Sequence, residues 1–247
     1  FFRLPISTKE NLRKVLEYET PRYTPFEKEE VYLDYHLLRE EKEWLSLVTV
    51  YAKRSDIDPY LSLLKKVGIK PLSVQIPSIA ALNLFLYHRR IEENEISVLL
   101  DVSKPYFEMN LMEGSDWRES LHLPMPSEEK TSDLMGTLKR SGLEPSSFAK
   151  TTIFVYGLDA DETILAALKE ADGIKGVSAP PIGRMKIAGE LARSSRIYPS
   201  LGVPLREMVK PWLDLNLLPP EMRKKVRQIG KPLSILFISL AVMISLT

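Results

Sequence analysis

The sequence has 247 residues, of which 44% are hydrophobic, enough to build one large or two modest domains with a sizeable core. This composition excludes an intrinsically disordered scaffold. The 34 basic and 33 acidic residues leave a formal charge of only +1, so no overall field recruits nucleic acid. The lack of cysteine excludes disulfides, thiolate zinc sites and cysteine nucleophiles, and it fits a reducing compartment.

The chain begins at Phe1 with neither an initiator methionine nor a signal peptide, and we expect an N-terminal portion to precede it. Ser7 and Glu10 have the spacing of a capping box, which predicts a helix beginning there. We expect Pro21 to end that helix.

The next stretch predicts a hairpin and a second helix. Residues 31–37 and 44–51 are rich in β-branched and aromatic side chains and flank a charged turn, which predicts two antiparallel strands. Ser55 or Asp56 is expected to cap a helix that runs to residue 67 and stops at Gly68.

The remainder predicts a mixed α/β body without internal repeats. Residues 96–102 are nearly all apolar, which is typical of a strand covered on both faces. Residues 69–76 predict a strand, and residues 79–88 predict an apolar helix buried against a sheet. Other expected strands are 106–112, 118–123 and 151–156, and other expected helices are 127–140, 161–170, 185–193 and 199–208.

The end of the chain has three parts in order. An apolar motif, Asn216-Leu217-Leu218-Pro219, is followed by a basic run at residues 221–231 and by an uncharged apolar run from Pro232 to Thr247. The apolar run predicts the start of a membrane-spanning helix that is truncated at the end of the sequence, with its basic flank in the cytoplasm. A buried helix of a soluble domain and a nucleic-acid patch are the competing interpretations.

Enzymatic motifs are lacking. No GxSxG, HExxH or P-loop pattern occurs. His36, His88 and His122 are far apart without carboxylates at ligand spacing, so we interpret them as structural and expect no metal site. The acids at residues 159–162 fit the first turn of a helix. Trp44, Trp117 and Trp212 fit core or interface anchors better than a base-stacking platform.

Several stretches together resemble one family. They are LPISTKENLRKVLEYE, EEVYLDY, PSIAALNLF, VLLDVS and LNLLPPEMRKK. They resemble the actin-like pilus assembly protein PilM running directly into the start of PilN, and the same arrangement describes the L component of type II secretion, GspL. The resemblance covers nearly the whole chain and is sharpest at the Asn-Leu-Leu-Pro motif.

The resemblance implies an α/β (α+β) fold class, an actin-like (ASKHA, ribonuclease H-like) cytoplasmic domain that is incomplete at its N-terminus. It further implies four parts. They are an inserted subdomain at 1–70, the remaining body at 71–210 with a second lobe from about residue 94, a linker at 211–231 that contains the motif, and a truncated transmembrane helix at 232–247.

Nucleotide binding has weak candidates. The resemblance assigns Asp101 and the loop after it to the phosphates, and Gly157 to the adenosine side. Proline follows at position 105, and the loop has no glycine to bring its backbone close to a phosphate. We therefore expect no cofactor, and we keep ATP binding as the alternative.

The motif predicts docking. Leu217 and Leu218 can anchor an extended peptide in a groove while Asn216 satisfies backbone groups and Pro219 ends it. In the PilM and PilN pair the equivalent peptide binds the actin-like body, and here it would bind in cis. A hydrophobic link that merely packs beside its own domain is the competing interpretation.

The resemblance implies a non-enzymatic, single-pass scaffold of the bacterial inner membrane, in a type IV pilus or type II secretion platform. Its expected partners are the motor ATPase, other inner-membrane platform proteins, the membrane and a homo- or hetero-dimeric mate, with no nucleic acid. The alternative is an actin-like ATPase with nucleotide-dependent partner binding.

Overall fold

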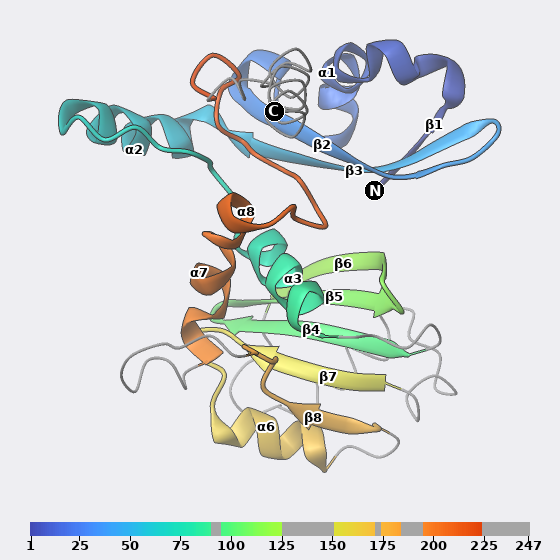
Figure 1. The fold of residues 1–247 in the computed structure, drawn as a ribbon, viewed down its shortest axis with the longest axis vertical. Coiled ribbons are helices and arrows are strands. Elements are labelled where there is room, and N and C mark those ends of the chain that lie inside the picture. The colour runs from blue at the N-terminus through green and yellow to red at the C-terminus, as the bar shows by residue number, and fades with distance from the viewer. Residues whose placement is uncertain (90–94, 125–150, 171–173, 184–194, 224–247) are drawn as a thin grey trace, which may run out of the picture.

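The computed structural model describes residues 1–89, 95–124, 151–170, 174–183 and 195–223. They form a three-stranded sheet and a five-stranded sheet that lie one above the other in Figure 1. Helix α3 and the short helices α7 and α8 lie beside the five-stranded sheet, on the side that faces the three-stranded sheet (Figure 1).

The three-stranded sheet contains the predicted hairpin. Strands β2 (Val31–Glu40) and β3 (Trp44–Lys53) pair antiparallel, and β1 (Phe2–Pro5) adds to the other edge of β3. Helix α1 (Leu12–Tyr23) covers one face with apolar side chains at helical spacing. The small core of this unit contains Leu12, Leu16, Leu33, Leu45 and Leu47.

Two expectations for α1 were wrong. A 3-10 helix, Ile6–Asn11, precedes it, and no side chain caps either element, so the capping box does not form. The chain enters that helix from Pro5 in extended conformation, and Thr8 donates its hydroxyl to the Pro5 carbonyl instead. Pro21 lies inside the last turn, where its missing N–H removes one hydrogen bond without ending the helix.

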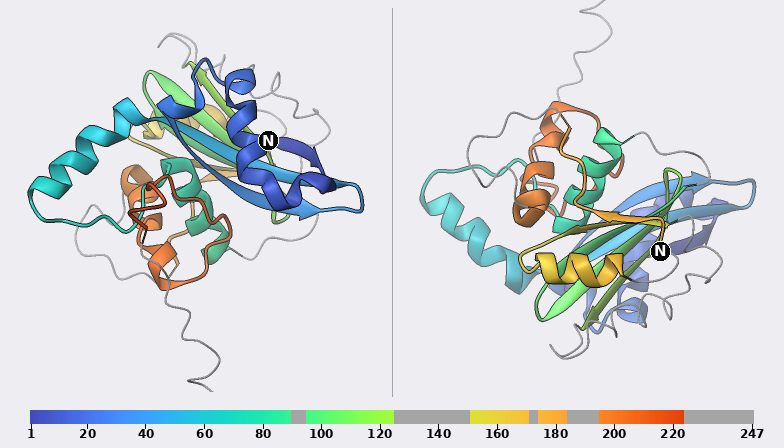
Figure 2. Two further views of the ribbon diagram at one scale, coloured as in Figure 1. Left: turned by 90° about the horizontal axis from the view of Figure 1, so that it is seen from above. Right: turned by 90° about the horizontal axis from the view of Figure 1, so that it is seen from below.

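Helix α2 (Arg54–Lys66) leaves the end of β3 and projects away from both sheets (Figures 1 and 2). Neither Ser55 nor Asp56 caps it, because the N-cap is Lys53, two residues before Ser55, and both candidates lie inside the helix. Gly68 has a φ of 74°, in the left-handed region that glycine adopts without strain, and the chain turns there as predicted.

The predicted strand at residues 69–76 does not form. A strand needs a neighbour for its backbone groups. Among the described residues, Ile69 and Ile76 bond backbone groups of the adjoining helical ends, at Leu64 and Ala80, and Val74 bonds the end of the chain, so the stretch pairs with no strand. The stretch therefore crosses from α2 to α3 as irregular chain.

Helix α3 (Pro77–His88) confirms the expected buried helix, and all residues from Ser78 to Phe85 are buried. It packs on the five-stranded sheet in the largest core cluster, which also includes Leu99, Phe154 and Tyr156. That cluster reaches the upper sheet through Val48 of β3. One core therefore joins both sheets.

The five-stranded sheet has the order β6-β5-β4-β7-β8. Strand β4 pairs antiparallel with β5 and parallel with β7, and it is covered on both faces as expected, because Leu99 joins the α3 side while Val98 and Leu100 join the side of α6. The strands are β4 (Ile96–Ser103), β5 (Tyr106–Glu113), β6 (Asp116–Pro124), β7 (Thr151–Tyr156) and β8 (Gly176–Ser178).

Helix α6 (Glu162–Lys169) begins after Asp161, whose carboxylate accepts the N–H of Ile164 at 2.9 Å. The single helix expected at residues 199–208 is instead two short helices, α7 (Tyr198–Gly202) and α8 (Leu205–Met208). Pro204 separates them, since it has no N–H to continue the hydrogen-bonding pattern. The helices expected at 127–140 and 185–193 lie outside the described residues.

None of the helices in the described ranges is long and apolar enough to cross a membrane. The membrane span expected at residues 232–247 lies outside those ranges.

Candidate functional site: the NLLP segment and its groove

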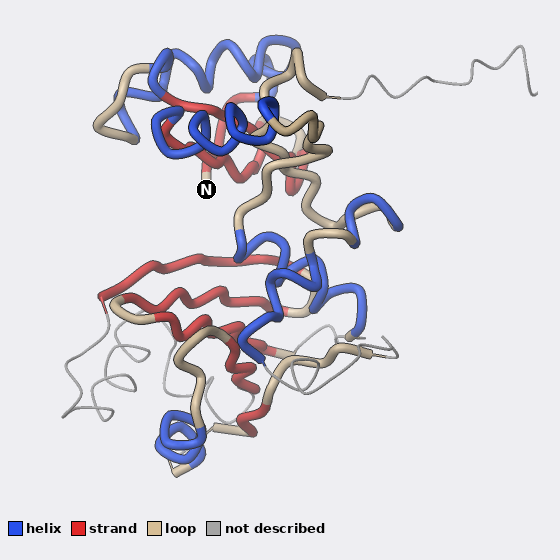
Figure 3. Tube along the Cα trace, turned by 90° about the vertical axis from the view of Figure 1, so that its left-hand side faces the viewer, coloured by secondary structure: helices blue, strands red, loops and turns tan. Residues whose placement is uncertain are grey.

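After α8 the chain runs back along the rest of the protein without regular secondary structure. We call residues 213–223 the NLLP segment and residues 1–210 the body. Figure 3 shows loop chain connecting the helices beside the five-stranded sheet with the three-stranded sheet. Leu213 and residues 215–219 are buried, although the stretch has almost no regular secondary structure. A buried irregular stretch must find partners for its backbone polar groups.

The apolar side chains anchor this segment. Leu213 and Leu215 belong to the core cluster that joins α3 to both sheets. Leu217 is 4% exposed and Leu218 is completely buried. Burying a leucine side chain contributes about 1.5–3 kcal/mol, so these four leucines dominate the stabilisation of the segment.

Asn83 of α3 holds the start of the segment. Its side-chain nitrogen donates to the Leu213 carbonyl at 2.9 Å, and its side-chain oxygen accepts the Leu213 N–H at 2.8 Å. One buried amide thus satisfies both backbone groups of one residue, as a neighbouring β-strand would.

Strand β2 contacts the amides of Asp214 and Asn216 through side chains on one face. The carboxylate of Asp34 accepts the N–H of Asn216 at 2.8 Å, and Nδ1 of His36 accepts the N–H of Asp214 at 3.2 Å. Along β2 the acceptors run from Asp34 to His36, whereas the donors that they contact run from Asn216 back to Asp214. The segment therefore runs antiparallel to β2, with side chains in place of a backbone ladder.

The side chain of Asn216 bonds the segment to the chain between α2 and α3. Its side-chain oxygen accepts the N–H of Val74 at 2.9 Å and that of Leu218 at 3.0 Å. The Val74 carbonyl in turn accepts the N–H of Leu217 at 2.9 Å. A single asparagine thereby fixes the segment to the irregular stretch between α2 and α3.

Arg223 folds back over the motif. Its guanidinium donates to the carbonyls of Leu218, at 2.8 Å, and Asn216, and lies 3.5 Å from the carboxylate of Asp34. Arg13 of α1 approaches the same carboxylate at 2.9 Å. Asp34 is 7% exposed, and the two cations compensate for the cost of burying its charge.

Pro219 is buried and Pro220 is exposed. Neither residue has an N–H, so the chain passes through this position without a donor that needs a partner. The Pro219 carbonyl accepts the N–H of Met222 at 2.9 Å, which turns the chain back so that Arg223 can reach the motif.

His36 is half-buried, and burial lowers its pKa below the usual value of 6.5 despite the carboxylates of Asp214 and Asp34 nearby. Lys210 lowers the pKa further. A neutral ring is what the contact requires, because Nδ1 can accept the Asp214 N–H only without its own proton.

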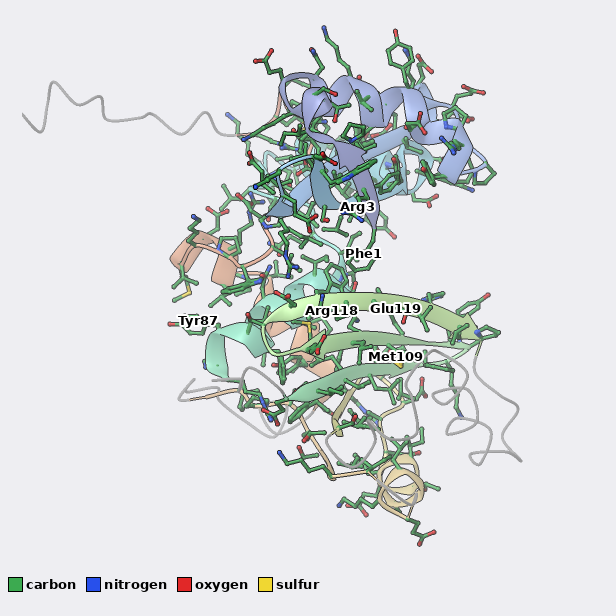
Figure 4. All side chains as sticks on the ribbon, turned by 90° about the vertical axis from the view of Figure 1, so that its right-hand side faces the viewer. Phe1, Arg3, Tyr87, Met109, Arg118 and Glu119 are labelled. Carbon is green, nitrogen blue, oxygen red and sulfur yellow. The ribbon has the colours of Figure 1, made fainter. Side chains whose placement is uncertain are left out.

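A cavity of about 380 Å³ lies between the two sheets beside the start of the segment, with Trp212 in its wall. In Figure 4, Phe1 extends from β1 toward β6, on which Arg118 is labelled. The ion pair between Arg39 of β2 and Asp116 of β6 crosses the same space. The sheets are therefore held together here as well as through the NLLP segment.

The residues assigned to a nucleotide contact one another. Gly157 has a φ of 119°, and a Cβ there would lie 2.4 Å from a carboxylate oxygen of Asp101, so close packing accounts for this glycine. The Ser103 hydroxyl bonds Asp101 at 2.7 Å, and burial raises the pKa of the Asp101 carboxyl. The N–H of Lys104 donates to Asp159 at 2.7 Å. That backbone amide, which a phosphate could otherwise use, is thus bonded to a side chain.

Across the parts of the chain that the structure describes, no group of three or more His, Asp or Glu side chains is arranged to hold a metal ion. Asp161 caps α6 and Glu162 lies in its first turn, as interpreted, whereas Asp159 accepts the N–H of Lys104 instead. Trp117 is buried, whereas Trp44 and Trp212 are partly exposed.

In the structure Asn216, Leu217, Leu218 and Pro219 are all buried against the body, and their role in binding a partner stays a prediction. The sequence interpretation missed Asp34, His36 and Asn83. One signal pointed to Asn83, since it is the single strongly polar side chain among the eight buried residues of α3. No local signal pointed to Val74, which contributes only backbone atoms.

No protein-family model matches the sequence. The search of curated proteins also found no match.

Solved structures of other proteins have a similar fold. The structure of a PilM-PilN type IV pilus biogenesis complex matches with a TM-score of 0.65 at 16% identity, over 84% of this chain and 75% of that chain. At this identity the likeness shows the fold and not the family. The chain thus has the α/β fold of that complex, which agrees with the fold class implied by the resemblance to the actin-like PilM.

Two further structures match with lower TM-scores. A Bacteroides thetaiotaomicron protein with an actin-like ATPase fold has a TM-score of 0.45 at 14% identity, over 81% of this chain and 68% of its own. The cytoplasmic domain of EpsL, an inner membrane component of the type II secretion system of Vibrio cholerae, has a TM-score of 0.45 at 12% identity, over 90% of this chain and 73% of its own.

Proposed function

We propose that this chain is a non-enzymatic assembly-platform scaffold of a type IV pilus or type II secretion machine. It links a cytoplasmic motor ATPase to periplasmic components across the bacterial inner membrane. Its body lies in the cytoplasm, and the apolar run at residues 232–247 starts the membrane span.

The buried NLLP segment carries this proposal. Four leucines and four side-chain acceptors or donors, from Asp34, His36, Asn83 and Asn216, hold it to the body. Pulling the basic run at 221–231 would therefore pull on the core that joins both sheets. Such a connection suits a coupling protein.

The solved structure with the same fold supports the proposal. That structure is a complex of PilM with PilN in type IV pilus biogenesis. In this chain the corresponding peptide motif follows the body in one polypeptide, so docking occurs in cis. The expected partners remain the motor ATPase and other inner-membrane platform proteins.

Docking can be tested by cutting the chain. A protease site inserted after the exposed Lys210 leaves residues 211–247 attached only by non-covalent contacts. We expect that fragment to co-elute with the body in a non-ionic detergent after cleavage. Changing Leu217 and Leu218 to alanine should release it, because each loses buried apolar surface.

Met222→Ala is the matched control, since Met222 lies in the same segment but is 40% exposed. It should leave co-elution unchanged. If the double leucine variant stays bound as tightly as the unaltered fragment, the segment merely packs beside the body, and the coupling proposal loses its basis.

The partner is tested separately. The host's pilus and secretion motor ATPases, each purified, are titrated against the full chain by biolayer interferometry. Binding of one of them supports the scaffold function and also decides between the two machines. Binding of neither at micromolar concentration would contradict it.

The alternative, an actin-like ATPase, is tested by titrating the chain with a fluorescent ATP analogue. Saturable binding that Asp101→Ala abolishes would favour it. We expect no such binding, because Lys104, whose backbone amide would face a phosphate, donates that amide to Asp159.

A further inference from the structure

A second cavity lies where the NLLP segment meets α1, β2 and the start of α2. Its volume is about 330 Å³, and it shares no lining residue with the cavity beside Trp212. Buried apolar side chains of β2 and of the segment form part of its lining, and four basic residues from four different elements form another part. The basic residues are Arg13 of α1, Lys28 of the 3-10 helix Lys28–Glu30, Arg54 of α2 and Arg223 of the segment.

Arg54 is fixed in place without a carboxylate. Its Nε donates to the Val31 carbonyl at 3.3 Å, and its Cζ lies 4.5 Å from the centre of the Tyr32 ring. In the part of the chain that the structure describes, Arg54 forms no ion pair. Its positive charge and its two terminal nitrogens are therefore available to a ligand.

The other two arginines share one buried carboxylate. Nη2 of Arg13 lies 2.9 Å from Asp34, and Nη2 of Arg223 lies 3.5 Å from it. Their remaining hydrogen bonds to the body and the segment go to backbone carbonyls. A carbonyl orients a guanidinium group but does not neutralise its charge.

Two exposed or half-buried acids, Glu17 and Glu29, also line the cavity. Glu29 lies 3.6 Å from Lys28, which it balances. When Asp34 is counted as well, three carboxylates face four basic side chains, so one positive charge stays unmatched. Because Glu17 and Glu29 belong to the side of α1 and its neighbouring 3-10 helix, the unmatched charge lies on the side of Arg54.

We propose that this cavity binds a phosphate group. Guanidinium groups present paired N–H donors that match phosphate oxygens, and Arg54 and Arg223 supply such donors from two elements. The volume is in the range of sites for small molecules. The phosphate belongs either to a soluble phosphorylated molecule or to the headgroup of an acidic phospholipid, because the basic run at 221–231 leads from Arg223 to the apolar run.

A bound phosphate ties the NLLP segment to the body, since Arg223 belongs to the segment and Arg54 to the body. Any ligand that binds only the docked arrangement stabilises it. After cleavage behind Lys210, glycerol 3-phosphate should therefore increase the fraction of the NLLP fragment that co-elutes with the body. This consequence rests on the docking proposed above, whereas phosphate binding by itself does not.

The soluble source is tested on the full chain in a non-ionic detergent. Inorganic phosphate and glycerol 3-phosphate are each titrated at constant ionic strength while the thermal unfolding temperature is measured, and we expect a saturable rise. Arg54→Gln should weaken the apparent affinity about tenfold, because it removes charge-assisted hydrogen bonds. Lys65→Gln removes the same charge from another exposed position of α2 and should leave the affinity unchanged.

Lys28→Gln provides a second variant in case Arg54→Gln disturbs the start of α2. Lys28 contacts only Glu29 and the Tyr18 ring among the described residues, so its loss removes no hydrogen bond to the backbone. It should also weaken phosphate binding.

The lipid source is tested on the full chain reconstituted in phosphatidylcholine vesicles with and without phosphatidic acid. A rise in unfolding temperature that needs both phosphatidic acid and Arg54 identifies a headgroup, and a rise with the soluble phosphates identifies a soluble ligand. No response in either arm, at up to about 10 mM phosphate, would overturn the proposal. So would a response that Arg54→Gln and Lys28→Gln leave intact.

The scaffold function has its own readout, the binding of a purified motor ATPase. Motor binding without any phosphate response would leave the scaffold standing and remove this site. A phosphate response without motor binding would keep the site and contradict the scaffold.

Discussion

Asn216 is the residue on which the hydrogen bonds of the NLLP segment converge. Its side-chain oxygen accepts two N–H groups, its own N–H donates to Asp34, and its carbonyl accepts from Arg223. The side chain is 4% exposed, so water cannot replace a lost partner.

Asn216→Ala should lower the free energy of unfolding, because it leaves the N–H groups of Val74 and Leu218 without an acceptor, at about 1–3 kcal/mol each. Urea unfolding measures the change. Asn11→Ala is the matched control, since Asn11 is exposed and its side chain caps nothing. Equal stability of the two variants would show that the asparagine contacts contribute nothing.

His36 makes the segment sensitive to pH. Burial lowers its pKa in the folded state, so the unfolded chain takes up the proton more readily as the pH falls. The free energy of unfolding should therefore decrease below about pH 6.5, the unperturbed value for histidine. The stabilisation is present above that pH and is lost in acid.

His36→Asn keeps an acceptor near Nδ1 but cannot titrate, so it should reduce this loss between pH 7.5 and 5.5 in urea unfolding. Part of the loss should remain, because burial also lowers the pKa of His88. An unchanged pH profile in the variant would contradict the role assigned to His36.

Among the elements, helices α3 and α7 are in close contact at Gly202 and Ala80. A Cβ added at Gly202 would lie 2.0 Å from the carbonyl oxygen of Ala80, so the two helices can approach this closely only because position 202 has no side chain. This packing places α8 and the start of the NLLP segment against α3.

Gly202→Ala should destabilise the protein by about 1–3 kcal/mol through overpacking, although alanine is the better helix former. Thermal unfolding shows whether the variant is less or more stable than the unaltered protein. Gly176→Ala serves as the control, because nothing lies within 4 Å of a Cβ there. A stabilising effect at position 202 would disprove the close contact.

Over the whole molecule, the core cluster that includes Leu215 joins the three-stranded sheet to the five-stranded sheet. Leu215→Ala should lower the free energy of unfolding by about 2–5 kcal/mol and weaken the packing between the two sheets. Hydrogen exchange should then accelerate in β2 and β3 more than in β4 and β7.

Leu168→Ala tests the same change in the other large cluster, on the α6 side of the five-stranded sheet. It should accelerate exchange in β4 and β7 and spare β2 and β3. Equal acceleration of both sheets in both variants would mean that the molecule unfolds as one unit regardless of Leu215.

Periodicity identified most of the elements. The hairpin of β2 and β3, the buried helix α3, and strand β7 at residues 151–156 were predicted, since each has a local hydrophobic pattern that only one kind of element satisfies. Residues 69–76 have a strand-like pattern but no neighbouring strand in the described chain, so the prediction there was wrong.

The sequence by itself determined the α/β class, the hairpin of β2 and β3 and the motif Asn216-Leu217-Leu218-Pro219, because these depend on residue order over short distances. Only the tertiary structure decided what holds the motif. Asp34 lies 182 residues from Asn216, and Asn83 lies 130 residues from Leu213. Buried backbone groups take their partners from whatever the fold brings beside them, and no local pattern records that choice.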